Sequence, residues 1–227
     1  MIRPINAGEG DVIALIDYDW TLADTTRSSN DLWTMISNIS GIAVERVAKD
    51  GEGFHPSHLG GYDYAAHVRS YGLDEAAMWG ELDELARTGA EQNPPAYIYD
   101  DSAPFMKELI NSGQDPTILT FGVEPFQLGK IKPNLAHLTG IQDCDDGRLQ
   151  IPVTAALEPK GLYIARAFPG RRGFLVDDKP NQQLPLGFAE IHLDRTRPED
   201  HIEQTETGFV VGSLMQALNA IKSLNHL

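Results

Sequence analysis

Acidic side chains follow two short apolar runs of this 227-residue sequence, at the points where each run ends. Asp17 and Asp19 close the run DVIALI, and Asp177 and Asp178 come directly after GFLV. Short apolar runs rich in β-branched residues and bounded by turn residues predict buried strands of a parallel sheet. Ligands of open α/β sheets bind beyond the carboxyl ends of the strands, so we expect these carboxylates at one edge of the sheet.

Crowded carboxylates repel one another, so such a cluster implies a bound cation, and an all-oxygen site suits Mg²⁺ better than zinc or copper. Two further residues are expected at this edge. Thr120 follows the apolar run TIL, and Lys160 opens a helical stretch, where its ammonium would add a positive charge. Lys130 or Lys132 in GKIKP is an alternative to Lys160, which we favour because PKG begins a helical run.

The elements that must position these residues alternate along the chain. Strands are predicted at residues 11–17, 117–121, 173–176 and 189–193, and helices at 102–111, 161–168 and 213–224. Alternation of strands with helices predicts an α/β fold with a doubly wound, mainly parallel, Rossmann-like sheet. The stretch between Asp24 and Pro94 differs, because helical periodicity in DLWTMISNI and LDEAAMWGELDELAR replaces strand runs. It is therefore interpreted as a helical insert after the first strand.

Composition excludes several classes of function. The 18 Lys and Arg residues against 33 Asp and Glu residues give a net charge of −15, which disfavours binding to nucleic acid phosphates. The first residues of the sequence lack the ~20-residue apolar run of a membrane span. The single cysteine, Cys144, cannot form an internal disulfide, which favours a reducing compartment. We expect a cytoplasmic protein with neither nucleic acid nor membrane partners, and the sequence leaves the oligomeric state open.

Taken in order, these motifs resemble those of the haloacid dehalogenase-like hydrolase superfamily, capped phosphatase type. The apolar strand ending in D-x-D-x-T is matched by VIALIDYDWTLADT, and the strand ending in Ser or Thr by ILTFG with Thr120. Lys160 in PKG matches the lysine at a helix start, and FLVDD matches the acidic pair after a strand. The resemblance spans most of the chain. Trp20 departs from it, because many relatives have Gly there, and this puts the shape of the pocket wall in question.

The resemblance implies that Asp17 is the nucleophile and forms an aspartyl-phosphate, while Asp19 is the general acid and base. The residue at position 19 is informative within the superfamily. Dehalogenases of the founding type lack an acid there, whereas phosphatases and phosphomutases have Asp. This chain therefore resembles the phosphotransferases.

The same resemblance implies the remaining roles at the sheet edge. Asp178 and the backbone carbonyl of Asp19 would join Asp17 around Mg²⁺, and Asp177 would support them through water or an indirect contact. Thr120 would hydrogen-bond the phosphoryl oxygens, and Lys160 would balance their charge.

The insert lies between the first and second motifs, where the superfamily carries its helical cap. The resemblance thus divides the chain into an α/β catalytic core at residues 1–23 and 95–227 and a helical cap at 24–94. A cap implies a small substrate, because a closing lid excludes water and selects by size. Within GEGFHPSHLGGYDY, the residues His55, His58 and Tyr62 are the candidate substrate-binding residues, expected to contact the leaving group.

The expectation from sequence is a Mg²⁺-dependent phosphatase that hydrolyses a small phosphorylated metabolite, a phosphoric monoester, through an aspartyl-phosphate intermediate. Two alternatives stay open. A phosphomutase would use the same intermediate on Asp17 and return the phosphoryl group to a bound sugar. A catalytically silent module would keep the fold and bind a phosphorylated ligand, and the intact pair of Asp17 and Asp19 argues against it.

Overall fold

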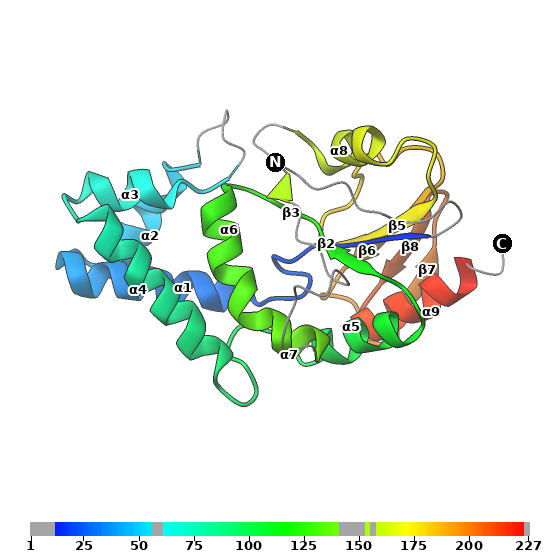
Figure 1. Cartoon of the computed structure of the whole chain (residues 1–227), viewed down its shortest axis with the longest axis horizontal. Helices are drawn as coiled ribbons and strands as arrows, with labels where there is room; N and C mark the ends of the chain where they lie inside the picture. The colour runs from blue at the N-terminus through cyan, green and yellow to red at the C-terminus, as the bar shows by residue number, and fades with distance from the viewer. Residues whose placement is uncertain (1–11, 56–60, 141–152, 155–157, 225–227) are drawn as a thin grey trace.

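A helical lobe and an α/β sheet lie side by side in the computed structural model, with helix α6 standing between them (Figure 1). The structure describes residues 12–55, 61–140, 153–154 and 158–224. The helices are α1 (Thr25–Ser40), α2 (Val44–Glu52), α3 (Tyr64–Ser70), α4 (Glu75–Ala90), α5 (Ser102–Asn111), α6 (Glu124–Ile131), α7 (Leu135–Thr139), α8 (Lys160–Ala167) and α9 (Leu214–Leu224), and a 3-10 turn, Lys132–Asn134, joins α6 to α7. None of these helices has both the length and the apolar character that crossing a membrane requires.

The main sheet of the described residues has the strand order β2-β1-β5-β6-β8-β7. Its strands are β1 (Ile13–Ile16), β2 (Pro116–Ile118), β5 (Gly173–Asp177), β6 (Phe188–Leu193), β7 (Ile202–Gln204) and β8 (Gly208–Val211). All neighbours are parallel except β7, which runs antiparallel to β8. A separate parallel pair consists of β3 (Thr120–Phe121) and β4 (Val153–Thr154). The predicted α/β class with a mainly parallel sheet is confirmed.

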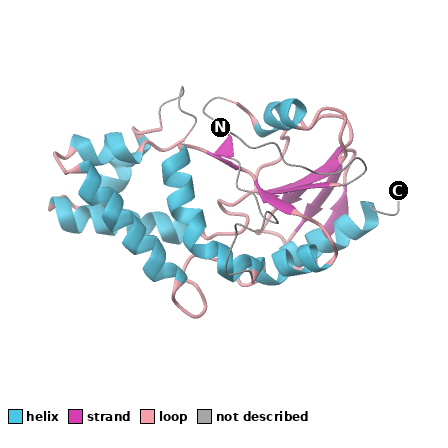
Figure 2. Ribbon diagram, viewed as in Figure 1, coloured by secondary structure: helices cyan, strands magenta, loops and turns pink. Residues whose placement is uncertain are grey.

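Helices cover both faces of the main sheet, which is why its central strands are apolar throughout (Figure 2). Successive side chains of a strand point to opposite faces. Ala14 and Ile16 pack into the core beneath α5, α7 and α9, whereas Ile13 and Leu15 pack into the core beneath α8. The fully apolar run of β1 therefore follows from burial on both sides.

Helices α1 to α4 form a lobe with its own hydrophobic core, which includes the buried Ile36, Val47 and Val68. Aspartates begin several of these helices: the side chain of Asp24 accepts from the Arg27 amide, and that of Asp74 from the Ala77 amide. Helix α6 contributes the buried Phe126 to the same core. The lobe thus packs against a helix that follows the second strand of the sheet.

Two features of the sheet differ from the prediction. The stretch 117–121 is not one strand, because β2 ends at Ile118 and β3 pairs with β4 outside the main sheet. The hairpin of β7 and β8 was not predicted. The three residues of β7 are exposed, so they carry no apolar pattern that would reveal a strand. The other predicted strands and the helices at 102–111, 161–168 and 213–224 are present, and their boundaries agree within one residue, except that β1 begins two residues later than predicted.

Candidate active site

Three carboxylates gather at the carboxyl ends of the neighbouring strands β1 and β5. Asp17 follows β1 directly, and its amide donates to the carbonyl of Val176 at 2.9 Å, which places it beside Asp177. Oxygens of Asp17, Asp177 and Asp178 all lie within 4.8 Å of one another. The parallel register of the two strands therefore brings together the acids that the sequence predicted at this edge.

Lys160, the first residue of α8, lies against this carboxylate group. Its Nζ atom is 2.5 Å from Asp17 Oδ1 and 2.5 Å from Asp177 Oδ2. All three side chains are almost completely buried, with exposed fractions of 7% for Lys160, 6% for Asp17 and 0% for Asp177. The structure thus places the favoured lysine, rather than Lys130 or Lys132, beside Asp17.

One ammonium group faces three acids in this cluster. Burial raises the pKa of Asp17 to about 8, with Asp177 adding to the rise and Lys160 opposing it. Burial alone would lower the pKa of Lys160, but the charges of Asp17 and Asp177 outweigh it and raise that pKa. The pKa of Asp178 is raised by burial and by Asp177. The local charge therefore favours an additional cation.

The donor set fits a hard divalent cation such as Mg²⁺, which prefers carboxylate oxygens. Asp177 has partners for its two oxygens, Lys160 Nζ and the Lys179 amide. Asp178 Oδ1, in contrast, is buried and has no hydrogen-bond partner among the described residues. Such an oxygen, beside two further carboxylates, is suited to coordinate a metal ion.

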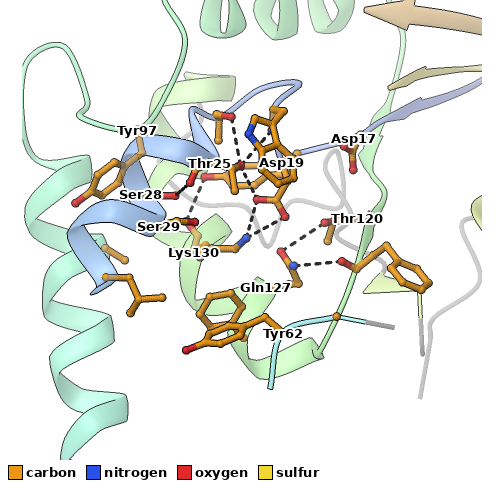
Figure 3. A pocket seen from close by; sticks show the side chains of 18 of the residues that line it. Asp17, Asp19, Thr25, Ser28, Ser29, Tyr62, Tyr97, Thr120, Gln127 and Lys130 are labelled. Atoms are coloured by element: carbon orange, nitrogen blue, oxygen red, sulfur yellow. Dashed lines mark hydrogen bonds and ion pairs between the residues drawn. The ribbon is translucent and has the colours of Figure 1, made fainter. Parts of the chain in front are cut away.

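Asp19 forms a separate ion pair on the other side of the site (Figure 3). Lys130 Nζ lies 2.7 and 2.9 Å from the two carboxylate oxygens of Asp19, and Thr25 Oγ1 donates to Asp19 Oδ1 at 2.8 Å. Burial alone would raise the pKa of Asp19, but Lys130, Thr25 and Gln127 together outweigh it and lower that pKa. The side chain of Asp19 is thus held as a carboxylate outside the three-acid cluster, which leaves its backbone carbonyl as the predicted metal ligand.

Trp20 has a backbone φ of 58°, in the left-handed region that glycine adopts at little cost. The Gly of the superfamily pattern would adopt this geometry without a Cβ contact. The indole Nε1 of Trp20 donates to Thr26 Oγ1 at 3.2 Å, and the side chain, 41% exposed, borders the cavity described below. The departure from the superfamily pattern therefore changes a wall of the cavity and leaves the two aspartates in place.

Thr120, the first residue of β3, is buried at the site. Its hydroxyl donates to Gln127 Oε1 at 3.4 Å, and Gln127 Nε2 donates to the carbonyl of Phe121 at 3.2 Å. The short strand and the first turns of α6 thus hold the threonine beside the two ion pairs.

Sequence reasoning missed the contribution of α6 to the site. Lys130 was weighed only as a substitute for Lys160, whereas the structure places both lysines here. Gln127, Lys130 and Asn134 are spaced three and four residues apart, so they follow one face of the chain through α6 and the 3-10 turn. This polar spacing in an otherwise apolar helix was the signal that could have found them.

A cavity of about 530 Å³ joins the site to the helical lobe. The core residues that line it include Asp17, Asp19, Thr120 and Lys160. Two of the candidate substrate-binding residues, His55 and Tyr62, line it from the lobe side. The third, His58, lies outside the described residues, as does Cys144. Asp177 and Asp178 are not among the lining residues and lie behind Asp17.

No protein-family model matches the sequence. Solved structures do share the fold over almost the whole chain. A haloacid dehalogenase (HAD)-like hydrolase from Burkholderia xenovorans LB400 has 16% identity and a TM-score of 0.64, with 94% of this chain and 97% of that chain covered. A magnesium-bound HAD hydrolase from Bacillus subtilis has 14% identity and a TM-score of 0.61, with 93% and 98% covered.

A HAD phosphatase from Thermococcus onnurineus has 16% identity and a TM-score of 0.57, with 93% of this chain and 98% of that chain covered. A dehalogenase has the same identity and a TM-score of 0.53. The chain therefore has the fold of the HAD-like hydrolases, as its motifs predicted. Because phosphatases and dehalogenases share that fold, the choice between them rests on the residues of the site.

A curated relative matches over a shorter stretch. An NAD(P)+ glycerol-3-phosphate dehydrogenase of Lactobacillus delbrueckii subsp. bulgaricus is 29% identical over 101 residues, which are 43% of this chain and 28% of that enzyme. The dinucleotide-binding fingerprint of such sheets is Gly-x-Gly-x-x-Gly after the first strand. This sequence contains no Gly-x-Gly-x-x-Gly, and Asp17 follows β1 instead.

Proposed function

We propose that this protein is a Mg²⁺-dependent phosphatase of the HAD-like type that hydrolyses a small phosphoric monoester through an aspartyl-phosphate on Asp17. The observation that carries the proposal is a second carboxylate, Asp19, which lines the same cavity as Asp17 and has its own cation, Lys130. A dehalogenase has no need of an acid at this position, whereas phosphoryl transfer to Asp17 requires a proton donor for the departing alkoxide.

The proposed hydrolysis proceeds in two displacement steps at phosphorus. In the first, an oxygen of Asp17 bonds to phosphorus, the bond from phosphorus to the ester oxygen breaks, and Asp19 gives its proton to that oxygen. In the second, water attacks the phosphorus of the aspartyl-phosphate, Asp19 takes the proton of that water, and Asp17 leaves as a carboxylate. Asp19 is thus reprotonated for the next cycle. The contact with Lys130 lowers the pKa of Asp19 and so favours the ionised form that the second step needs.

Neighbouring side chains support these steps through charge. Lys160 contacts Asp17 and is placed to balance the negative charge of a phosphoryl group there. Thr120, buried in the same cavity wall, would exchange its bond to Gln127 for one from its hydroxyl to a phosphoryl oxygen. Asp17, Asp178 and the backbone carbonyl of Asp19 would hold Mg²⁺, with Asp177 supporting. The ion, when bound, neutralises charge that develops on the transferred group.

We also propose that residues 24–94 act as the cap of this enzyme. Helices α1 to α4 fall in this range, and side chains of α1 and α4 line the cavity opposite Asp17 and Asp19. A lid in this position would exclude water from the reacting phosphoryl group.

Hydrolysis of an aryl phosphate with Mg²⁺ or with EDTA, in wild type and in Asp17→Asn, tests the proposal. We expect metal-dependent turnover that falls on the order of 10⁴-fold or more in the variant, because the nucleophile is lost. The matched control is Asp115→Asn, an exposed acid outside the three-acid cluster and the cavity lining, which should keep wild-type turnover. Phosphate release that persists in Asp17→Asn or in EDTA would contradict the mechanism. Phosphoryl return to a sugar phosphate, or phosphate binding without turnover, would identify the mutase or the silent module.

A further inference from the structure

Most of the lobe side of the cavity is apolar, although Thr25, Ser28, Ser29 and His55 also line it. Its apolar and aromatic lining residues are Leu32, Trp33, Tyr62, Leu82, Leu85 and Ala86. Phe126 adds another ring from α6, and its ring centroid lies 5.2 Å from that of Tyr62. A volume of about 530 Å³ is in the range of small-molecule sites. The wall opposite the reacting groups is therefore an apolar surface of ligand size.

Charge is confined to the other end of the cavity. Its charged lining residues are Asp17, Asp19, Lys130, Lys160 and Lys179. None of them lies on α1 to α4, and no Asp, Glu, Lys or Arg from the described part of the lobe lines the cavity. The titratable lobe residue His55 has its pKa lowered by burial, which favours the neutral imidazole. The described part of the lobe thus offers no ion to a second phosphate or a carboxylate on the ligand.

Three of the hydroxyl groups along this side are engaged within the protein. The hydroxyl of Tyr62 is 2.7 Å from His67 Nδ1, and that of Tyr97 donates to Asp31 Oδ2 at 3.0 Å. Ser28 Oγ donates to the carbonyl of Thr25 at 3.1 Å. Figure 3 shows the hydroxyls of Tyr62 and Tyr97 directed away from Asp19. These residues present rings and aliphatic carbons, rather than hydrogen-bonding atoms, to a ligand.

We propose that the substrate is a phosphoric monoester of an uncharged, largely apolar alcohol, aromatic or branched aliphatic, whose carbon skeleton packs against Trp33, Tyr62 and Leu85. This inference rests on the proposed phosphatase function. Burying an apolar group against these side chains is favourable, because it removes carbon surface from water. A sugar or a second phosphate would lose its hydrogen bonds to water and find few partners on this wall, which disfavours binding.

The test measures hydrolysis of two phosphate esters, 2-phenylethyl phosphate and glycerol 3-phosphate, in the presence of Mg²⁺. Both are esters of primary alcohols, so their leaving groups have similar reactivity and differ in polarity. We expect kcat/KM to be at least about tenfold higher for the phenylethyl ester, since a methylene difference in an apolar pocket alone discriminates by roughly that factor. Equal values, or a preference for the glycerol ester or for glucose 6-phosphate, would overturn the inference and leave the phosphatase function intact.

Leu85→Asp tests whether this preference arises at the lobe wall of the cavity. The substitution places one negative charge on that wall, at a partly exposed position. We expect it to lower kcat/KM for the phenylethyl ester at least about tenfold and to leave that for glycerol 3-phosphate within about twofold. Ala77→Asp adds the same charge to an exposed position of α4 outside the cavity, and should change neither value. An equal loss for the two esters in Leu85→Asp would contradict an apolar subsite at this wall.

A binding measurement separates this inference from the proposed function. Titration calorimetry with 3-phenylpropylphosphonate and with a hydroxylated propylphosphonate needs no turnover, because the C–P bond is not hydrolysed. Tighter binding of the phenyl compound, weakened by Leu85→Asp, supports the apolar subsite even if no ester is hydrolysed. Equal binding of the two phosphonates would overturn it, whatever the enzyme's activity.

Discussion

Two lysines, Lys160 and Lys130, form ion pairs with aspartates beside the same cavity, but the two groups differ in their balance of charge. Lys160 lies between Asp17 and Asp177, with Asp178 close by, and its side chain is only 7% exposed. Lys130 contacts the two oxygens of Asp19 alone, and its side chain is 14% exposed. The carboxylates around Lys160 therefore outnumber their cation, whereas Lys130 and Asp19 form a pair of one cation and one anion.

The difference indicates what each region is built to receive. A cluster with more carboxylates than cations suits a metal ion and a transferred phosphoryl group, because each brings charge that the other balances. The neutral pair lowers the pKa of Asp19 and so holds it as the carboxylate that would take the proton of water in the second displacement. The helical lobe has no charged lining residue among those described. The cavity is therefore charged at the end near the sheet and apolar at the end near the lobe.

Replacing Lys160 by Met should produce the largest change. The substitution leaves Asp17 and Asp177 buried without their cation, so we expect the free energy of unfolding to fall by about 3 to 5 kcal/mol. Urea denaturation without metal measures it, and added Mg²⁺ should recover part of the loss. A change below about 1 kcal/mol would show that the carboxylates do not depend on Lys160 for their charge balance.

The equivalent change at Lys130 should cost less stability and mainly affect turnover. Lys130→Met removes a partly exposed pair, so we expect about 1 to 2 kcal/mol of destabilisation. Aryl phosphate turnover should fall roughly 10²-fold, because Asp19 loses the group that orients it. Lys132→Met is the matched control, since Lys132 is exposed and does not line the cavity. Similar turnover in the two variants would contradict a positioning role for Lys130.

The smallest expected effect concerns the lobe, where the buried His67 contacts Tyr62 and Tyr71, and Tyr71 donates to Asp50. Burial lowers the pKa of His67, although Asp50 opposes this. The folded state therefore favours neutral histidine, and its contribution is complete above the unfolded pKa of about 6.5.

As pH falls from 7 toward 5, this contribution should be lost, by at most about 1.4 kcal/mol per pH unit. Urea denaturation of wild type and His67→Gln across this range measures the difference in slope. Because His55 and His137 also have lowered pKa values and are present in the two proteins, their effect cancels in the comparison. Parallel slopes would rule out His67 as the titrating group.

Much of the fold was predictable because the signals were local. Helix α5 spans Ser102–Asn111, the range predicted for it. The short strand β3 could not be separated from β2, since its pairing with β4 depends on a partner more than thirty residues away. The hairpin of β7 and β8 was not predicted. The exposed β7 carries no hydrophobic pattern, whereas the short apolar run of β8 was a signal that could have indicated a strand.

For the site, the sequence by itself determined which acids meet. Asp17 and Asp177 end apolar strands, and neighbouring parallel strands present their carboxyl ends at one edge. Only the tertiary structure decided that Lys130, 111 residues from Asp19, closes the second ion pair. It also decided that the hydroxyl of Tyr62 turns to His67 and its ring to the cavity. Strand ends are encoded by local hydrophobic pattern, whereas these contacts depend on how α6 and the lobe pack together, which no single segment specifies.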